Sequence, residues 1–195
     1  MSGFSLYFGL GRDHILDYAN GYDHILFVVA LCSIYLLRDW KKILILVTAF
    51  TVGHSITLAL ATLDIISIDG ALIEFLIPLT IFITAISNLL SKEAGIATGR
   101  VQINYVLALF FGLVHGLGFS NYLRFLLGKE GNIISPLLAF NLGLELGQII
   151  VVTLFLVIGF ILIDLLKVSR RDFKLVLSSA IAGIALILLK DRVFW

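Results

Sequence analysis

Six runs of about 20 mostly apolar residues dominate this chain and restrict it to folds that suit a lipid bilayer. They cover residues 18–37, 43–63, 71–90, 105–122, 136–166 and 173–189. Inside a bilayer each backbone polar group must be paired within the protein, and a helix achieves this within one segment. Apolar residues make up 60% of the chain and charged residues only 14%, which is atypical of a soluble domain. We predict an all-α, polytopic membrane protein in which residues 1–195 form a single domain of six transmembrane helices.

The basic residues predict the orientation of these helices. Nine of the 14 Lys and Arg residues lie in the loops on one face, and the remaining five lie on the other face, which also collects most of the loop acids. Because loops rich in Lys and Arg stay in the cytoplasm, both termini are predicted to be non-cytoplasmic. The first residues lack the basic and apolar regions of a cleavable signal peptide, so we expect the first span to direct insertion.

Composition also excludes several classes of function. A formal net charge of +1 gives no basis for nucleic-acid binding. The single cysteine, Cys32, allows neither an internal disulfide nor a thiolate metal cluster. The GxxxxGK[ST] pattern of a nucleotide-binding P-loop does not occur, so transport by this chain would depend on an ion gradient or a partner.

The tetrapeptide Asp-His-Ile-Leu occurs twice, at residues 13–16 and 23–26. Ionisable side chains are costly in a membrane and mark candidate functional sites. The segment that holds the two copies supplies four candidate metal ligands, namely His14, Asp17, Asp23 and His24.

Two conformations of this repeat are open. In a helix that begins before Gly21, Asp17 and His24 share one face and Asp23 points nearly opposite. A break at Asn20 and Gly21 would instead allow the two copies to fold toward each other.

Five of the predicted helices carry an acid or a histidine at a similar depth. At about 1.5 Å per residue, this depth is roughly 5 to 14 Å below the outer surface. The residues are His24, His54, Glu74, His115 and Glu145. Structural polar residues have no reason to share a level, so the agreement indicates a common site. His14 lies nearer the surface, where it could equally be a metal ligand or a solvated residue at the membrane interface.

Polar and small residues accompany these candidates. Asn141, Glu145 and Gln148 follow i, i+4, i+7 and share one stripe of their helix. Thr51 and Ser55 form a similar stripe beside His54, and we treat both stripes as supporting residues. Glycines separated by four positions surround His115 and Glu145, at 112 and 116 and at 143 and 147. Such ridges permit close helix packing, which predicts that these two helices contact each other.

Imidazole and carboxylate donors suit nickel, cobalt, zinc or iron(II). The sequence leaves open a metal site, a hydrogen-bonded polar core that holds the helices together, and a proton relay or catalytic site. Asp23 could be a ligand or an acceptor that orients His24. Glu74 lies near a helix start, so it could equally satisfy free backbone N–H groups there.

Four segments resemble the HupE/UreJ family of small bacterial membrane proteins. They are HILDYANGYDHILF (14–27), FTVGHSITL (50–58), FGLVHGLGF (111–119) and FNLGLELGQ (140–148). The resemblance implies a six-helix secondary permease for nickel or cobalt, associated with hydrogenase or urease maturation. It also places Asp23, His24, His54, His115 and Glu145 at the family's polar positions. Members of the family often begin with a cleavable signal sequence, which we do not expect here.

We therefore expect a multi-pass protein of the bacterial inner membrane that imports a divalent transition metal, nickel or cobalt first and zinc next, through an outer His/Asp/Glu site. The alternative is an intramembrane metal-dependent hydrolase in which Asp23 or Glu145 acts as base. A third hypothesis is a subunit that binds metal without translocating it. Expected partners are the metal ion and the lipid bilayer, with a homo-oligomer or an accessory metal-handling protein also open.

Overall fold

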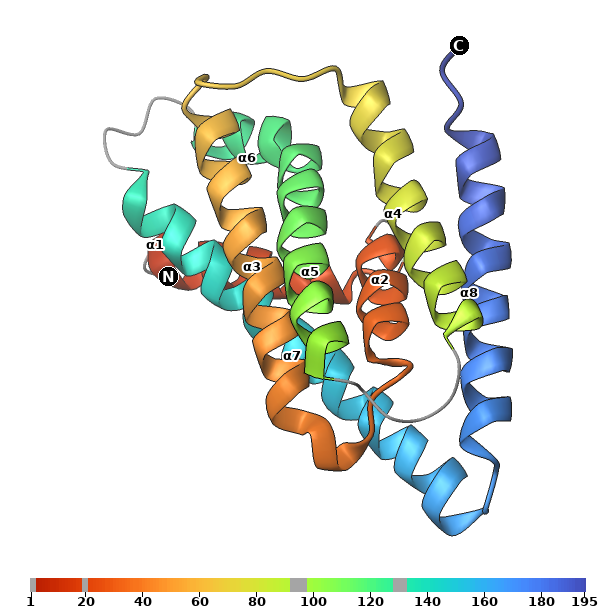
Figure 1. The fold of residues 1–195 in the computed structure, drawn as a ribbon. Coiled ribbons are helices and arrows are strands. Elements are labelled where there is room, and N and C mark those ends of the chain that lie inside the picture. Colours follow the sequence, from red (N-terminus) through yellow and green to blue (C-terminus); the bar gives the residue numbers. More distant parts are fainter. Residues whose placement is uncertain (1–2, 19–20, 92–97, 128–132) are drawn as a thin grey trace.

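Helices account for all the regular structure in the described part of this computed structural model, which comprises residues 3–18, 21–91, 98–127 and 133–195 (Figure 1). The α-helices are α1 (Gly3–Leu16), α2 (Tyr22–Cys32), α3 (Trp40–Thr62), α4 (Gly70–Leu90), α5 (Thr98–Gly118), α6 (Ser120–Leu127), α7 (Ile134–Phe160) and α8 (Arg170–Asp191). A 3-10 turn (Leu37–Asp39) leads into α3, and a π-helical turn (Ile161–Leu165) extends α7. The predicted all-α class is confirmed.

Among the described residues, four helical segments are long and apolar enough to cross a membrane, and two more apolar helices are shorter. The long segments are Leu37–Thr62, Gly70–Leu90, Ile134–Leu165 and Arg170–Asp191, and the shorter ones are Tyr22–Cys32 and Ile103–Gly118. The chain is thus a membrane protein with several apolar helices.

The first predicted span is shorter than expected, because α2 comprises only 11 residues and ends at Cys32. The helix is broken near Gly21, so the open question about the Asp-His-Ile-Leu repeat is answered in favour of folding back. Gly21 permits a tight turn: an added Cβ there would lie 2.5 Å from the carbonyl oxygen of His14. Residues 19 and 20 lie outside the described ranges.

Helix α1 is an element that the hydropathy pattern did not predict. It lies across the bundle at the level where α2 begins, and it packs against the first part of α7 (Figure 1). Tyr7, Gly11 and Ile15, four residues apart, form its buried face. This position carries His14, near the end of α1, into the middle of the protein.

Close backbone contacts at glycines join α1 to α7. A Cβ on Gly11 would collide with the carbonyl oxygen of Phe140, and a Cβ on Gly143 would collide with that of Phe8. At Gly147 an added Cβ would lie 2.9 Å from the Cβ of Ile15. At these glycines no side chain separates the two helices, so their backbones lie in direct contact.

A second contact of the same kind joins α3 to α5, which lie side by side (Figure 1). Gly112 faces the carbonyl oxygen of Phe50, Gly116 faces that of His54, and Gly53 faces that of Leu109. The prediction that the glycines around His115 and Glu145 pack against each other was therefore wrong. Each ridge contacts a different helix, and glycine spacing alone does not specify the partner.

Replacing Gly112 by alanine tests the α3–α5 contact. We expect Gly112→Ala to lower the free energy of unfolding by about 1–3 kcal/mol, because the methyl group must push two backbones apart. Gly183→Ala is the matched control, since nothing lies within 4 Å of a Cβ at this exposed position of α8. Thermal unfolding of the detergent-purified variants measures the difference. Equal melting temperatures for the two variants would contradict the close contact.

Candidate metal centre

All four histidines of the chain gather at one place, although each comes from a different helix. The ring centroids of His14 and His24 are 4.6 Å apart, and that of His54 lies 6.3 Å from each of them. One ligand nitrogen from each of these three histidines lies within 4.8 Å of the other two. His115 is adjacent, with its ring centroid 5.2 Å from that of His24. Imidazole nitrogens at such separations could hold one metal ion after small side-chain adjustments.

The inward nitrogens of this cluster lack hydrogen-bond partners. The Nε2 atoms of all four histidines are buried without a partner in the described part of the protein, as is Nδ1 of His54. Burying a polar atom unpaired costs free energy, and native proteins rarely tolerate it without a reason. Unpaired Nε2 atoms on four neighbouring histidines from four helices indicate a site built for a ligand.

Hydrogen bonds to the opposite ring nitrogens set the orientation of two histidines. The Nδ1 atom of His24 lies 3.0 Å from Oδ1 of Asp23, and Nδ1 of His115 lies 2.8 Å from the carbonyl oxygen of Phe111. Because both partners can only accept, each Nδ1 is assigned the proton. Each Nε2 is then left with a free lone pair, as in metal sites where a carboxylate or carbonyl fixes the tautomer.

Helix geometry explains these hydrogen bonds. Asp23 lies in the first turn of α2, where its carboxylate also accepts from the backbone N–H of His24. His115 bonds to the carbonyl four residues earlier in α5, so its ring lies along the helix rather than away from it.

An acidic vestibule leads to the cluster. It is a cavity of about 820 Å³ whose lining includes His14, His24 and His115. Its charged lining consists of four carboxylates and one guanidinium, from Asp13, Asp17, Asp23, Glu74 and Arg192. The excess of negative charge favours cations over anions at this entrance.

Glu74 belongs to this vestibule and does not cap α4. Asp69 is the N-cap residue, and its carboxylate accepts from the backbone N–H groups of Ala71 and Leu72. Arg192 reaches across from α8 and donates to the carbonyl oxygen of Glu74, while its Nη1 also lies 3.6 Å from Oδ2 of Asp23. Asp13 and Arg192 were not among the predicted site residues. Asp13 begins the first Asp-His-Ile-Leu copy, as Asp23 begins the second, so the repeat could have indicated it, whereas no sequence pattern marks Arg192.

Glu145 is not brought into the histidine group. Its carboxylate accepts a hydrogen bond of 2.7 Å from Thr48, in a polar contact between α3 and α7. Thr48 precedes His54 by six residues, which corresponds to about 9 Å along α3. The other acid and histidine candidates line the vestibule or join the cluster.

Two of the supporting residues, Thr51 and Gln148, meet between α3 and α7. Thr51 donates to the side-chain oxygen of Gln148 at 2.8 Å, and Ser55 donates to the backbone oxygen of Thr51. Asn141 lies beside His54 and donates to the carbonyl oxygen of Leu137. Of these three hydrogen bonds, the one between Thr51 and Gln148 joins α3 to α7. Ser55 and Asn141 bond within their own helices.

Buried aromatic rings close the cluster on its inner side. Phe27 and Phe50 have ring centroids 5.1 and 5.2 Å from that of His115, and the two rings are 5.1 Å apart. Phe140 stacks on Phe119 at 4.9 Å and lies 5.9 Å from His14. Phe27, Phe50 and Phe140 therefore pack against the histidines outside the vestibule lining, whereas Phe119 lines the vestibule itself.

Comparison with known proteins agrees with this picture. A model of the HupE / UreJ protein family matches residues 1–192. The chain belongs to the HupE/UreJ family. Comparison with curated protein sequences and with solved structures finds no significant match. Family membership thus covers the helices that carry the four histidines and the vestibule.

Asp23 is expected to raise the metal affinity of His24 without binding the ion. Asp23→Asn should weaken binding of Ni²⁺ or Co²⁺ about 10-fold to 100-fold, because a neutral amide holds the Nδ1 proton less strongly. Titration calorimetry on the purified protein measures this affinity. Asp164→Asn provides the matched control at an exposed position outside the vestibule. An unchanged affinity in Asp23→Asn would contradict the orienting role.

The separate location of Glu145 gives a further prediction. His54→Ala should abolish the rise in melting temperature that a bound metal ion produces by mass action. Glu145→Gln should preserve that rise, because the carboxylate bonds to Thr48 rather than facing the cluster. Thermal unfolding with and without Ni²⁺ tests both variants. A loss of metal response in Glu145→Gln would show that Glu145 is a ligand after all.

Proposed function

We propose that this protein is a secondary permease that takes up a divalent transition metal, nickel or cobalt, through its histidine centre. The observation that carries the proposal is the set of four unpaired Nε2 atoms below an acidic vestibule. A cation drawn into the vestibule would exchange water for imidazole at its inner end. The ion is therefore the cargo of the site.

The donor set supports this choice of ion. Neutral imidazole suits nickel, cobalt and zinc, whereas copper(I) prefers sulfur ligands. The one cysteine, Cys32, lies outside the histidine group. Membership of the HupE/UreJ family favours nickel or cobalt over zinc.

We propose that the chain forms a single domain with six membrane crossings, in which α2, α3, α4, α5, α7 and α8 each provide one. At about 1.5 Å per residue, α2 by itself is too short for a hydrocarbon core of about 30 Å, so its crossing would include the chain segments on either side of it. The break between α1 and α2 would then place His14 and His24 within the membrane, as broken helices do in other transporters. The distribution of basic residues supports termini outside the cytoplasm of a bacterial inner membrane.

A polar stripe on α4 offers a route inward from the histidines. Thr80, Thr84 and Asn88 recur every four residues and are all buried. Thr84 donates to the backbone oxygen of Thr80, and Asn88 donates to that of Ala30. Phe27 and Phe50 close the histidine cluster on its inner side, so release requires these rings to move.

The hydrolase alternative has less support, because it needs a carboxylate available as a base beside the metal. Oδ1 of Asp23 lies against the ring of His24, and Glu145 accepts from Thr48. Transport has no such requirement, and the neutral ligands it needs are the ones present.

Uptake into proteoliposomes tests the proposal. We expect radiolabelled Ni²⁺ or Co²⁺ to accumulate with the unmodified protein and to fall at least about 10-fold in His54→Ala and in His115→Ala, because each loses a ligand nitrogen. Asp164→Asn, far from both histidines in the sequence, serves as the control for reconstitution. Histidine-dependent binding without accumulation would overturn transport and favour the enzyme or a binding subunit.

A further inference from the structure

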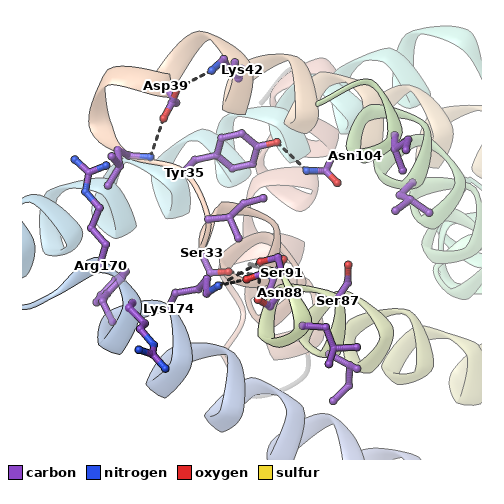
Figure 2. A pocket seen from close by; sticks show the side chains of 18 of the residues that line it. Ser33, Tyr35, Asp39, Lys42, Ser87, Asn88, Ser91, Asn104, Arg170 and Lys174 are labelled. Atoms are coloured by element: carbon purple, nitrogen blue, oxygen red, sulfur yellow. Dashed lines mark hydrogen bonds and ion pairs between the residues drawn. The ribbon is translucent and has the colours of Figure 1, made fainter. Parts of the chain in front are cut away.

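Figure 2 shows a second cavity, of about 750 Å³. It is lined by the end of α4 and the early parts of α5 and α8, whereas the vestibule is lined by the start of α4 and the ends of α5 and α8. The segment after α2 and the start of α3 also line the second cavity. None of the four histidines lines it. The metal centre therefore does not account for this cavity.

The lining of this inner cavity is strongly basic. It includes five cationic side chains, from Arg38, Lys42, Arg170, Arg171 and Lys174, and one carboxylate, from Asp39. Such an excess of positive charge disfavours a divalent cation and favours an anion.

The single acid is already paired within the cavity wall. Asp39 accepts from Lys42 at 2.8 Å and from the backbone N–H of Leu36 at 3.4 Å. The guanidinium groups of Arg38, Arg170 and Arg171 make no hydrogen bond or ion pair with a described residue. Three planar groups that each offer paired N–H donors therefore remain available to a phosphate.

Lys174 is held at the base of the cavity. Its Nζ donates to the backbone oxygen of Ser91 at 2.7 Å and lies 3.3 Å from Oγ of the same residue (Figure 2). An ammonium group carries three N–H bonds, so one donor stays free for a ligand. Hydroxyl and amide groups of Ser33, Ser87, Asn88 and Asn104 add neutral polar lining.

An apolar stripe continues from the basic residues toward the lipid. Ile83, Ile86 and Leu90 recur at i, i+3, i+7 on α4, and Ile103 and Leu107 lie four residues apart on α5. Ile83, Leu90 and Ile103 are 48%, 78% and 59% exposed, so protein does not cover them. Aliphatic chains running along the bundle would cover these side chains.

We propose that the inner cavity binds an anionic phospholipid, with its phosphate against the arginines and Lys174 and an acyl chain between α4 and α5. A basic pocket between helices at a membrane interface is the arrangement that recognises anionic headgroups. A free phosphate would satisfy the arginines but would leave the adjacent apolar stripe uncovered. This site is independent of metal transport.

Thermal unfolding and native mass spectrometry of the full-length detergent-purified protein test this proposal. Phosphatidylglycerol and phosphatidylcholine with identical acyl chains are compared, together with inorganic phosphate alone. We expect phosphatidylglycerol to raise the melting temperature of the unmodified protein and to stay bound to it. Arg170→Gln and Arg171→Gln should each weaken phosphatidylglycerol binding about fivefold. Lys41→Gln is the matched control: it removes the same charge at the same end of the bundle, but Lys41 does not line the cavity.

A second variant separates headgroup binding from folding. Ile103→Trp keeps every charge and fills the apolar stripe, so it should also reduce retention of phosphatidylglycerol. Equal effects of the two lipids, an equal loss of binding in Lys41→Gln, or full replacement of the lipid effect by inorganic phosphate would each overturn the proposal.

Discussion

Direct backbone contact at glycine is the constraint on which the rest of this structure depends. Gly112 and Gly53 let α5 lie against α3, and Gly11 and Gly143 let α1 lie against α7. The first contact holds α3, which carries His54, against α5, which carries His115, and the second brings the ring of His14 to 6.3 Å from that of His54. A wider spacing at either contact would separate nitrogens that now lie within reach of one ion. The polar centre thus depends on residues that have no side chains.

The two ends of the bundle carry opposite charge. Carboxylates dominate the vestibule above the histidines, whereas arginine and lysine dominate the cavity at the other end. A divalent cation is therefore attracted at one end and repelled at the other. An anionic headgroup beside Arg170 and Arg171 would offset much of that repulsion.

The comparison of sequence and structure is instructive at individual residues. The shared depth of His24, His54 and His115 was a correct signal, because depth depends only on counting along each helix. Glu145 met the same criterion, yet it bonds to Thr48, since depth says nothing about rotation around the bundle. His14 was assigned to the surface as readily as to the site. Its position depends on α1 lying across the bundle, which hydropathy does not reveal.

By itself, the sequence determined the helical class, the membrane environment, the family and the polar residues available to a site. Those properties follow from composition, from apolar runs and from local motifs, which act within one segment of chain. Only the tertiary structure decided which glycine ridge meets which helix, how the Asp-His-Ile-Leu copies fold together, and which charges line each cavity. The physical reason is that packing partners and helix rotation depend on contacts between segments far apart in the chain, which a local pattern cannot encode.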